Sequence, residues 1–580
     1  MALYVISKPS QNKHLDGLDQ EPILGIDLET AGQDGLNPYK SKIRLFQMSS
    51  REHIFIIDLQ EMSLPPQVRK LLISPSITKV FHNAKFDCKH LMHHQNLTPD
   101  SIFCTFLASQ LLSSGNQHHR HGLGAVVQRY LNVRLDKSMQ TSDWSGKLTE
   151  EQIQYAANDV RHLIPLYEVM SKEITRLKLR KVSQLEFRTV FPVAQMELNG
   201  IKLDPAAWEQ LETKYRARLQ QLEQRLEGEL RDDRLLPGFD SINLNSPDQV
   251  KRALEKRGHR LNSTSEKELK NLPTKDPVIE LLLEYRHASR ILQSTILPFN
   301  EAVLKETGRV HPHYFQIASP SGRFSCSDPN IQQVPREKSI RAAFVPDEGN
   351  TYIVADYSQV ELRVAAGLSN DPTMRKAYEK SLDLHTLTAS LTAGKAYESI
   401  SKQERQAAKA INFGLIYAMG PAGLQRSAKT SYGVEMSLQD AEAFHRRFFE
   451  SYNGIALWHK QLEEMGRQTK YIRTAAGRLR RYHHDNIRIT ELFNVPVQGT
   501  AAEILKSALC IFYDEIQKSE LNANLVAIIH DEILVETPAE SAEIVRNILI
   551  SSMKKGAEWL VPGIPFDVDA NIAKSWAEKG

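Results

Sequence analysis

TYIVADYSQVELR at residues 351–363 and NLVAIIHDEILVE at residues 524–536 are the two stretches on which the fold prediction depends. In each, a run of apolar and β-branched residues predicts a buried strand that ends at, or is interrupted by, an aspartate, Asp356 or Asp531. Neither aspartate has a Lys or Arg beside it. Because a buried carboxylate is costly unless a cation offsets it, we expect both acids to meet around divalent metal ions. For either stretch alone, a simple turn cap would be the better interpretation.

The segment between them, RQAAKAINFGLIY at residues 405–417, repeats a spacing of four residues. On a helix this spacing places Arg405, Lys409, Phe413 and Tyr417 on one face. Cations at such a spacing usually form a solvated helix face, and aromatics at such a spacing usually face the core. A stripe that changes from cations to aromatics midway fits neither of these explanations. It suits a nucleoside triphosphate, with the phosphates on the cations and the sugar and base against the rings.

These motifs resemble motifs A, B and C of family A DNA polymerases, the polymerase I type, in DYSQVELR, RxxxKxxxNFGxxY and HDE. SGRFSCSDPNIQQVP is similar to the family's primer–template segment, and NVPVQGTAAEILK is similar to its template-side helix. The resemblance implies template-directed DNA synthesis from dNTPs onto a primer 3′ end, by two-metal nucleotidyl transfer.

A second set of acids lies in the N-terminal third. PILGIDLET predicts a buried strand that delivers Asp27 and Glu29 at its end, on one face. FHNAKFDCKHL places Asp87 near a helix start, and EEQIQYAANDVRHLIPLYEVM predicts one amphipathic helix with Tyr155 and Asp159 adjacent on its surface. Four acids from three elements imply a pair of metals, beside which a tyrosine can position an attacking water.

In this order, the N-terminal motifs resemble the DEDDy 3′→5′ proofreading exonucleases, which share a ribonuclease H-like fold. A D-x-E at a strand end is common by itself, but the presence of every acid and of the tyrosine disfavours a degenerate domain kept for structure. Asn83 matches a position that this family places near the DNA end. The expected fold class is therefore α/β multidomain, with a ribonuclease H-like exonuclease domain followed by a right-hand polymerase domain of palm, fingers and thumb.

The expected division is an exonuclease domain over residues 1–180 and a polymerase domain over 181–580. Within the second we expect the thumb at about 205–300, the palm at about 300–400 and 490–580, and the fingers at about 400–490. WEQLETKYRARLQQLEQRLEGELR predicts long charged helices, whose charge alternation would equally fit a solvent-bridging helical hairpin. SPDQ at residues 246–249 is a helix-capping signal. Since the exonuclease motif begins near residue 25, we expect no 5′ nuclease domain before it.

The resemblance implies a role for each residue of the polymerase motifs. Asp356 and Asp531 would hold two Mg²⁺ ions, with the carbonyl of Tyr357 as a further ligand. Arg405 and Lys409 would stabilise the leaving group, and Lys409 is the candidate general acid. The exonuclease acids would hold two more Mg²⁺ ions, and Mn²⁺ is an alternative in both sites.

The remaining implied roles concern sugar, base and DNA. Glu361 would exclude ribonucleotides, braced by a hydrogen bond to Tyr417, and Glu532 would support the metal site rather than serve as a primary ligand. Further nucleotide-binding candidates are Gln359 and His385. Candidates for contact with the primer or template are Arg323, Asn330, Gln332, Asn494, Gln498 and His530. Such minor-groove contacts sense pair geometry rather than sequence.

Three residues depart from the family pattern. Ala418 stands where Gly is usual, Thr490 where relatives often carry Arg, and Glu503 where Asp is more familiar in QGTAA(D). None belongs to the metal sites, so we expect that any effect of these departures will be on fidelity or on template binding rather than on activity itself.

Composition restricts the class of protein. A chain of 580 residues should contain two to four compact units, and a net charge of only +3 requires that basic residues cluster locally if DNA binds. GRLRR at residues 477–481 is such a cluster, although a solvated charge run is the commoner explanation. The four scattered cysteines indicate neither a disulfide framework nor a zinc site. Without a membrane-length apolar run or a secretion signal, we expect a cytoplasmic monomer with no membrane partner.

Three alternatives were weighed against a DNA polymerase. A single-subunit RNA polymerase shares the acids and the Arg–Lys helix, but Glu361, Phe413 and the exonuclease favour deoxynucleotides. Two complete metal sites oppose an inactive DNA-binding scaffold, and the intact DYSQVELR and HDE motifs oppose a nuclease with a helical DNA-binding tail. A phage enzyme, a bacterial or plasmid polymerase and a mature organellar enzyme all fit, and the processivity or replication partner stays open.

Overall fold

The structure is a computed structural model that describes residues 1–116, 118–136, 139, 142–230, 242–482 and 487–578. It contains two compact units. The first comprises residues 1–199, 314–325 and 353–572, and the second comprises residues 200–313, 326–352 and 573–580. The expected boundary near residue 180, between an exonuclease and a polymerase domain, does not coincide with a boundary of these units, and it stays a prediction.

The N-terminal part of the first unit is built on a six-stranded sheet in the order β1-β4-β3-β2-β5-β6. β1 is parallel to β4, β2 and β3 are antiparallel, and β5 is parallel to both β2 and β6. The strands are β1 (Ala2–Ile6), β2 (Ile23–Gly32), β3 (Ser41–Ser49), β4 (His53–Asp58), β5 (Thr78–Phe81) and β6 (Ile102–Cys104). Because β2 continues to Gly32, Asp27 and Glu29 lie within the strand rather than at its end, and a bulge follows Glu29.

Helices of this part pack on the sheet and carry the remaining acids. They are α1 (Pro66–Ile73), α2 (Ala84–Gln95), α3 (Thr105–Leu112), α4 (Leu123–Leu131), α5 (Glu150–Arg161), α6 (Leu163–Arg176) and α7 (Arg180–Asn199). The single helix expected from EEQIQYAANDVRHLIPLYEVM is two helices, α5 and α6, which meet at His162. Pro165 explains the break, because it lacks an N–H and clashes with the carbonyl four residues earlier.

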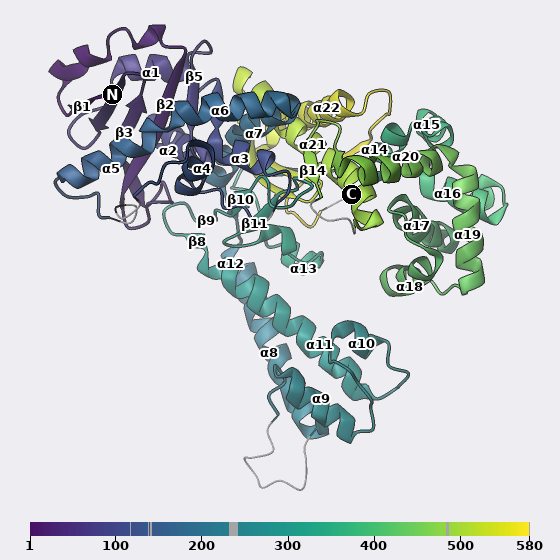
Figure 1. Cartoon of the computed structure of the whole chain (residues 1–580). Coiled ribbons are helices and arrows are strands. Elements are labelled where there is room, and N and C mark those ends of the chain that lie inside the picture. The colour runs from purple at the N-terminus through teal and green to yellow at the C-terminus, as the bar shows by residue number, and fades with distance from the viewer. Residues whose placement is uncertain (117, 137–138, 140–141, 231–241, 483–486, 579–580) are drawn as a thin grey trace. The chain divides into compact units, whose positions relative to one another are not determined.

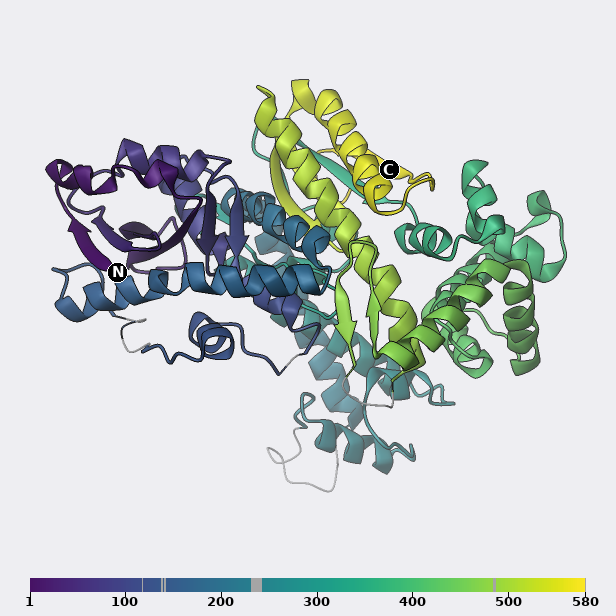
Figure 2. The same cartoon turned by 45° about the horizontal axis from the view of Figure 1, so that its top comes forward.

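A four-stranded sheet in the order β15-β16-β12-β17 forms the centre of the other part of the first unit. Its strands are β12 (Asn350–Tyr357), β15 (Asn524–Ile529), β16 (Glu532–Pro538) and β17 (Val568–Ala573). NLVAIIHDEILVE is thus not one strand but an antiparallel hairpin, with His530 at φ +60° in its turn. α21 (Ile489–Lys518) and α22 (Ala542–Leu560) run side by side (Figure 2), and α22 packs against β16.

The rest of the first unit is mainly helical over residues 360–482. The helices are α14 (Val360–Ser369), α15 (Pro372–Glu379), α16 (Leu384–Ala393), α17 (Lys402–Ile416), α18 (Pro421–Tyr432), α19 (Leu438–Ser451) and α20 (Asn453–Thr469). A short hairpin of β13 (Tyr471–Arg473) and β14 (Leu479–Arg481) follows. A capping box of Ser401 and Glu404 starts α17, which fixes where the predicted nucleotide-binding stripe begins.

The second unit is an elongated helical pair on a small aromatic core. α8 (Pro205–Leu230) and α11 (Pro277–Ile291) run side by side, and α9 (Pro247–Lys256) and α10 (Glu266–Lys270) lie near one end of the pair (Figure 1). Ser246 caps α9 by accepting a hydrogen bond from the Gln249 N–H, as the SPDQ signal predicted. The core contains Trp208, Phe299, Phe344 and Trp576, whose neighbouring ring centroids lie 5.1–5.9 Å apart.

Short elements complete the second unit and its junctions with the first. They are β7 (Ile201–Lys202), α12 (Leu297–Glu301), β8 (Val303–Leu304), β9 (Arg309–Val310), β10 (His313–Phe315), β11 (Ser325–Ser327) and α13 (Lys338–Arg341).

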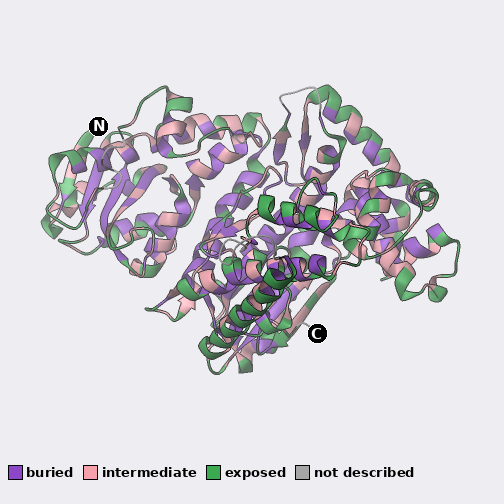
Figure 3. Cartoon of the chain, turned by 90° about the horizontal axis from the view of Figure 1, so that it is seen from below, coloured by how far each residue is buried: buried purple, intermediate pink, exposed green. Residues whose placement is uncertain are grey.

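Burial follows the pattern expected for packed layers. The strands of both larger sheets are largely buried, and many outward faces of the helices are exposed (Figure 3). Among the described residues, no helix combines the length and the apolar character that a membrane crossing requires. All four cysteines are buried and unpaired with one another.

Candidate active sites

The acids of the N-terminal sheet form one compact cluster. Asp27 and Glu29 lie two residues apart on β2, so their side chains point to the same face of the sheet, where Asp159 of α5 meets them. One carboxylate oxygen from each lies within 4.8 Å of the other two. A set of carboxylate oxygens at this separation suits a hard cation such as Mg²⁺ or Mn²⁺.

Asp87 lies against this cluster from the first turn of α2 and is fully buried. Burial raises its pKa well above the usual range, and the negative charges of Asp27 and Glu29 raise it further. Carboxylates that raise one another's pKa need a positive charge to stay ionised together. The donor set of Asp27, Glu29 and Asp159 therefore fits a divalent metal, and Asp87 lies beside it, within reach of the charges of Asp27 and Glu29.

Tyr155 and Gln47 complete the surroundings of the cluster. Burial raises the pKa of Tyr155, and its hydrogen bond with Asp159 and the charge of Glu29 act in the same direction, so the phenol keeps its proton as a donor. Gln47 is fully buried on β3 and pairs with Asp27 in the strand register. With its amide oriented to satisfy both ends, Gln47 donates to Asp27 Oδ2 (3.0 Å) and to the Ala156 carbonyl (3.2 Å). Sequence reasoning missed Gln47, although the pairing of β2 with β3 would have indicated it.

Asn83 precedes α2 in the left-handed conformation, at φ +65°. This conformation is uncommon outside glycine but tolerated by Asn, and it sets the turn from β5 into the helix that carries Asp87. Asn83 therefore lies directly before the helix that carries Asp87, and its contact with the DNA end stays a prediction.

Asp356 and Asp531 adjoin neighbouring strands of the central sheet. Asp356 is the penultimate residue of β12, and Asp531 lies in the hairpin turn that leads into β16. Both are half-buried. Glu532 is buried, which agrees with a supporting role, and the exposed His530 shares the turn. The Tyr357 hydroxyl donates to the Met553 carbonyl (2.7 Å), which anchors the strand end on α22.

The predicted cation–aromatic stripe lies on α17, with Tyr417 as the residue that caps its C-terminus. Arg405 already has a partner, because its Nε and Nη2 donate to Asp383 at 3.0 and 2.8 Å. Burial alone would raise the pKa of Asp383, but hydrogen bonds from Arg405 and Thr386 outweigh it and hold that pKa well below its usual range. Sequence reasoning missed Asp383, whose Asp-x-x-Thr spacing signals a helix N-cap.

The neighbours of Asp383 include both further nucleotide-binding candidates. Gln359 donates to Asp383 Oδ2 at 3.1 Å. His385 is only 2 % exposed, and its Nδ1 lies 2.9 Å from Asn412 Nδ2. The ring of His385 lies 5.8 Å from that of Phe413, centroid to centroid. Burial lowers the pKa of His385 to about 4, so a phosphate would meet a neutral imidazole here.

Glu361 lies in the first turn of α14 and has two partners. The Tyr417 hydroxyl donates to one of its carboxylate oxygens, and Arg323 forms an ion pair with the other. Burial raises the pKa of Tyr417, and the negative charge of Glu361 adds to that effect. The expected brace between Glu361 and Tyr417 is thus present, and Arg323 joins it.

The predicted DNA contacts fall in both compact units. Arg323, Asn494, Gln498 and His530 belong to the first unit, and Gln498 shares a hydrogen bond with the Tyr417 hydroxyl. Asn330 and Gln332 belong to the second, where Asn330 caps a short turn by accepting from the Gln332 N–H (3.1 Å).

The three departures from the family pattern have different surroundings. Ala418 follows α17 at φ +55°, in a conformation that glycine adopts more readily. Thr490 lies exposed in the first turn of α21. Glu503 is fully buried and accepts hydrogen bonds from the Thr474 hydroxyl (2.6 Å) and the Ala476 N–H (3.0 Å), so groups of the protein itself hold its carboxylate.

The basic cluster GRLRR is not one solvated run. Arg478 is only 3 % exposed and forms an ion pair with the buried Glu186 of α7. Arg480 donates to the Gly115 carbonyl. Two of the three arginines are thus held by protein groups.

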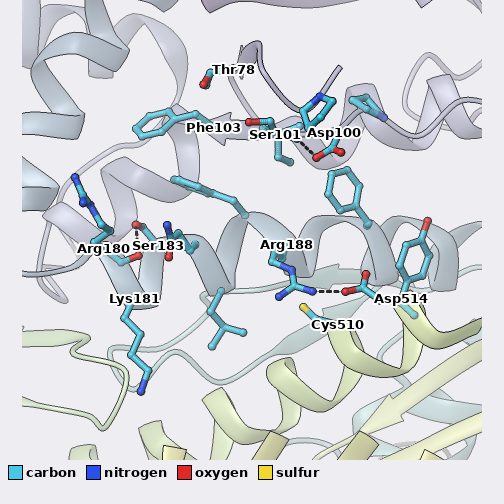
Figure 4. Close-up of a pocket in the computed structure, with 18 of the residues that line it drawn as sticks. Thr78, Asp100, Ser101, Phe103, Arg180, Lys181, Ser183, Arg188, Cys510 and Asp514 are labelled. Carbon is cyan, nitrogen blue, oxygen red and sulfur yellow. Dashed lines mark hydrogen bonds and ion pairs between the residues drawn. The ribbon is translucent and has the colours of Figure 1, made fainter. Parts of the chain in front are cut away.

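A cavity of about 1090 Å³ lies in the first unit, between the β5–β6 region, α7 and α21 (Figure 4). Arg188 and Asp514 form an ion pair on its wall, and Lys181 Nζ lies 4.4 Å from the Trp559 ring centroid. Its lining contains none of the predicted site residues, so it is distinct from both acid sites.

Two separate sets of carboxylates, one of them beside a helix with cations and aromatics, are typical of metal-dependent enzymes of phosphoryl-transfer chemistry. Comparison with known proteins specifies the class. The family model of DNA polymerase family A matches residues 206–578, and that of the 3′-5′ exonuclease matches residues 8–175.

Individual relatives agree with the family models. The chain is 35 % identical to DNA polymerase I of Aquifex aeolicus (strain VF5), over 99 % of both chains. It is 34 % identical to the thermostable DNA polymerase I of Thermus thermophilus over 71 % of this chain, but spans only 48 % of that relative. Its fold is similar to the POL domain of Pol1 from M. smegmatis in complex with DNA primer-template and dNTP, with a TM-score of 0.84, 23 % identity and 99 % coverage of both chains.

The chain therefore belongs to DNA polymerase family A and carries a 3′-5′ exonuclease domain. It is a DNA-directed DNA polymerase with exonuclease activity, which confirms the predicted function and fold class.

Proposed function

We propose that Asp356 and Asp531 are the metal ligands of the polymerase site and that α17 receives the incoming dNTP. The hydrogen bond from Tyr417 to Glu361 carries this proposal. It joins the last residue of the nucleotide-binding stripe to the helix that begins four residues after Asp356. The carbonyl of Tyr357 is a further candidate ligand, and Glu532 supports the site.

The chain's own residues orient the triphosphate. Arg405 and Lys409 bind phosphate oxygens, and Lys409 gives a proton to the departing pyrophosphate. Gln359 and Arg405 both donate to Asp383, and Gln359 and His385 complete the phosphate side. Phe413 and Tyr417 flank the sugar and base. Two Mg²⁺ ions per site, when bound, supply activation of the attacking oxygen and neutralisation of phosphate charge.

Glu361 supports DNA rather than RNA synthesis. A carboxylate held by two partners cannot swing aside at no cost, so its bulk opposes a ribose 2′-OH. This observation favours a DNA polymerase over a single-subunit RNA polymerase.

The proposed exonuclease site uses Asp27, Glu29, Asp87 and Asp159 as ligands. Tyr155 orients the attacking water through its proton, and Asn83 contacts the DNA end. The compact cluster of Asp27, Glu29 and Asp159 and the raised pKa of Asp87 beside it support this assignment.

Primer–template DNA and dNTPs are the proposed partners, in line with the complex that the M. smegmatis structure contains. The proposed DNA contacts are Arg323, Asn330, Gln332, Asn494, Gln498 and His530. We propose a thumb at about residues 205–300, a palm at about 300–400 and 490–580, and fingers at about 400–490. The enzyme is proposed to act as a cytoplasmic monomer, with or without a separate processivity partner.

The test is single-turnover incorporation of a dNTP on primed DNA. Asp356→Ala or Asp531→Ala should lower the rate by several orders of magnitude, because about 8 kcal/mol or more of barrier lowering depends on metal-assisted chemistry. DNA affinity should largely survive, since phosphate contacts elsewhere supply most of it. Near-normal turnover in either variant would refute the assignment.

A further inference from the structure

Four buried charges form a cluster between α7, the β13–β14 turn and α21. Their side chains are at most 4 % exposed. Lys506 Nζ lies 2.5 Å from Glu186 Oε1, Arg478 pairs with the same oxygen, and Arg478 Nε lies 3.4 Å from Glu503 Oε1. Buried ion pairs add little net stability, because desolvation offsets most of their attraction. A geometric role is therefore the better explanation for this one.

Lys506 uses its remaining donors on one backbone segment. Its Nζ donates to the Gln316 carbonyl (2.7 Å) and to the Gly322 carbonyl (2.9 Å). An ammonium has three donors, so Lys506 is fully used by these two carbonyls and Glu186. The Gln316 side chain returns to the Glu186 carbonyl at 2.9 Å. A single buried ammonium thus holds both ends of residues 316–322.

The segment between these two carbonyls is a tight turn. Gly322 N–H donates to the Ser319 carbonyl (2.8 Å), and Ala318 N–H donates to the Arg323 carbonyl (3.2 Å). Gly322 has φ +80°, and the Arg478 guanidinium fills the space that a Cβ at this position would need. The charge cluster therefore packs directly against the turn.

Arg323 is the residue that leaves this turn, and it ion-pairs with Glu361. Glu361 has Tyr417 as its other partner. A continuous set of contacts therefore runs from Lys506 through the turn to Arg323 and Glu361. All of these residues belong to the first compact unit.

We propose that Lys506 is a positioning residue for sugar selection: it fixes the 316–322 turn so that Arg323 holds Glu361 in place. The inference rests on the proposed role of Glu361 as the group that excludes ribonucleotides. Lys506 itself is fully buried, so its ammonium has no exposed surface with which to contact nucleotide or DNA. Without its ammonium, the turn loses its anchor, Arg323 moves, and Glu361 keeps only Tyr417.

The experiment measures the ratio of kcat/KM for a dNTP to that for the matching rNTP, with full-length enzyme and primed DNA. Lys506→Met keeps the length of the side chain and removes the charge. We expect the ratio to fall about tenfold, which corresponds to about 1.4 kcal/mol. The control is Arg44→Met, which removes an equally buried cation from a 2.7 Å pair with Asp58 on the N-terminal sheet. It should lower the melting temperature and leave the ratio unchanged.

Gly322→Ala provides a second route to the same turn, because it removes none of the four charged side chains. Its Cβ would displace the Arg478 guanidinium or shift the turn, so the ratio should again fall. This variant decides the question if Lys506→Met does not fold. A folded Lys506→Met or Gly322→Ala enzyme with the wild-type ratio would overturn the inference.

Glu361→Ala separates this inference from the function on which it rests. If Glu361→Ala relaxes sugar selection and the turn variants do not, only the role of Lys506 is wrong. If Glu361→Ala leaves the ratio unchanged, the proposed function of Glu361 is itself wrong, and the inference falls with it.

Discussion

Glu361 is the residue whose contacts distinguish two explanations most clearly. A carboxylate in the first turn of α14 is favoured by the helix dipole, which contributes about 0.3–1 kcal/mol. That effect requires no side-chain partner, yet Glu361 accepts from Tyr417 and pairs with Arg323. Both partners come from outside α14, so they orient the carboxylate rather than merely stabilise the helix start.

Glu361→Ala should therefore relax sugar selection. We expect the rNTP/dNTP efficiency ratio to rise at least tenfold, because the clash with the 2′-OH disappears. A helix-dipole role predicts instead a small loss of stability and an unchanged ratio. Steady-state kinetics with both substrates, together with a thermal melt, separates the two.

At the scale of elements, Asp276 at the start of α11 combines a cap with an ion pair. It accepts from the Val278 N–H (3.0 Å), and Arg257 donates to it at 2.9 and 3.0 Å. Hydrogen bonds from Arg257, joined by one from His259, hold the pKa of Asp276 well below its ordinary value of 3.8. The folded carboxylate thus stays charged where the unfolded one is already protonated.

Asp276→Ala should lower the protection of the α11 amides against hydrogen exchange, by about 0.5–2 kcal/mol as for other N-cap losses. Because the folded pKa is depressed, the stabilising contribution is complete above pH 3.8 and is lost as pH falls below it. The difference between wild type and variant should accordingly shrink as the pH falls below 3.8. Ser246→Ala, which removes the cap of α9, is the matched control and should leave α11 unchanged. A difference that grows on acidification would contradict the assigned sign.

The elements also show what the sequence could and could not predict. Local signals sufficed where they act within one element: the stripe on α17, the cap at Ser246 and the alternation of Asp27 and Glu29 are all observed. The prediction missed the division of α5 from α6 because the amphipathic periodicity continues through His162, although Pro165 in the sequence marked the break. It also missed the hairpin at His530, because both of its strands are apolar and no Gly marks the turn.

Pairings between distant segments were predicted only where the family resemblance implied them, as for the hydrogen bond between Tyr417 and Glu361. Arg478 looked like part of a basic run, and only the fold shows that Glu186, almost 300 residues earlier, pairs with it. Gln47 and Asp383 were missed for the same reason, since their partners Asp27 and Arg405 lie on other elements. Residue type and spacing thus indicated the site acids, whereas the groups that orient them required the structure.

At the scale of the whole molecule, the two acid sets belong to two separate sheets. Asp27 and Glu29 lie on β2 of the six-stranded sheet, and Asp356 lies on β12 of the four-stranded one. Strands place such side chains rigidly, which suits a reaction that depends on carboxylate geometry. Because the two sheets have no strand in common, loss of one acid set should leave the other intact.

Asp27→Ala combined with Glu29→Ala should therefore separate the two activities. Metal stabilisation of the leaving and attacking oxygens contributes several kcal/mol, so degradation of single-stranded or mismatched 3′ ends should fall by about 1000-fold or more. Incorporation of dNTPs on matched primers should stay within about twofold of wild type, since Asp27 and Glu29 are not part of the proposed polymerase site. Asp34→Ala removes an exposed acid shortly after the same strand and should change neither rate. The measurement is primer shortening and extension on one labelled duplex, with and without Mg²⁺. A double variant that still shortens mismatched primers at the wild-type rate would show that the cluster of Asp27, Glu29 and Asp159 is not the nuclease site.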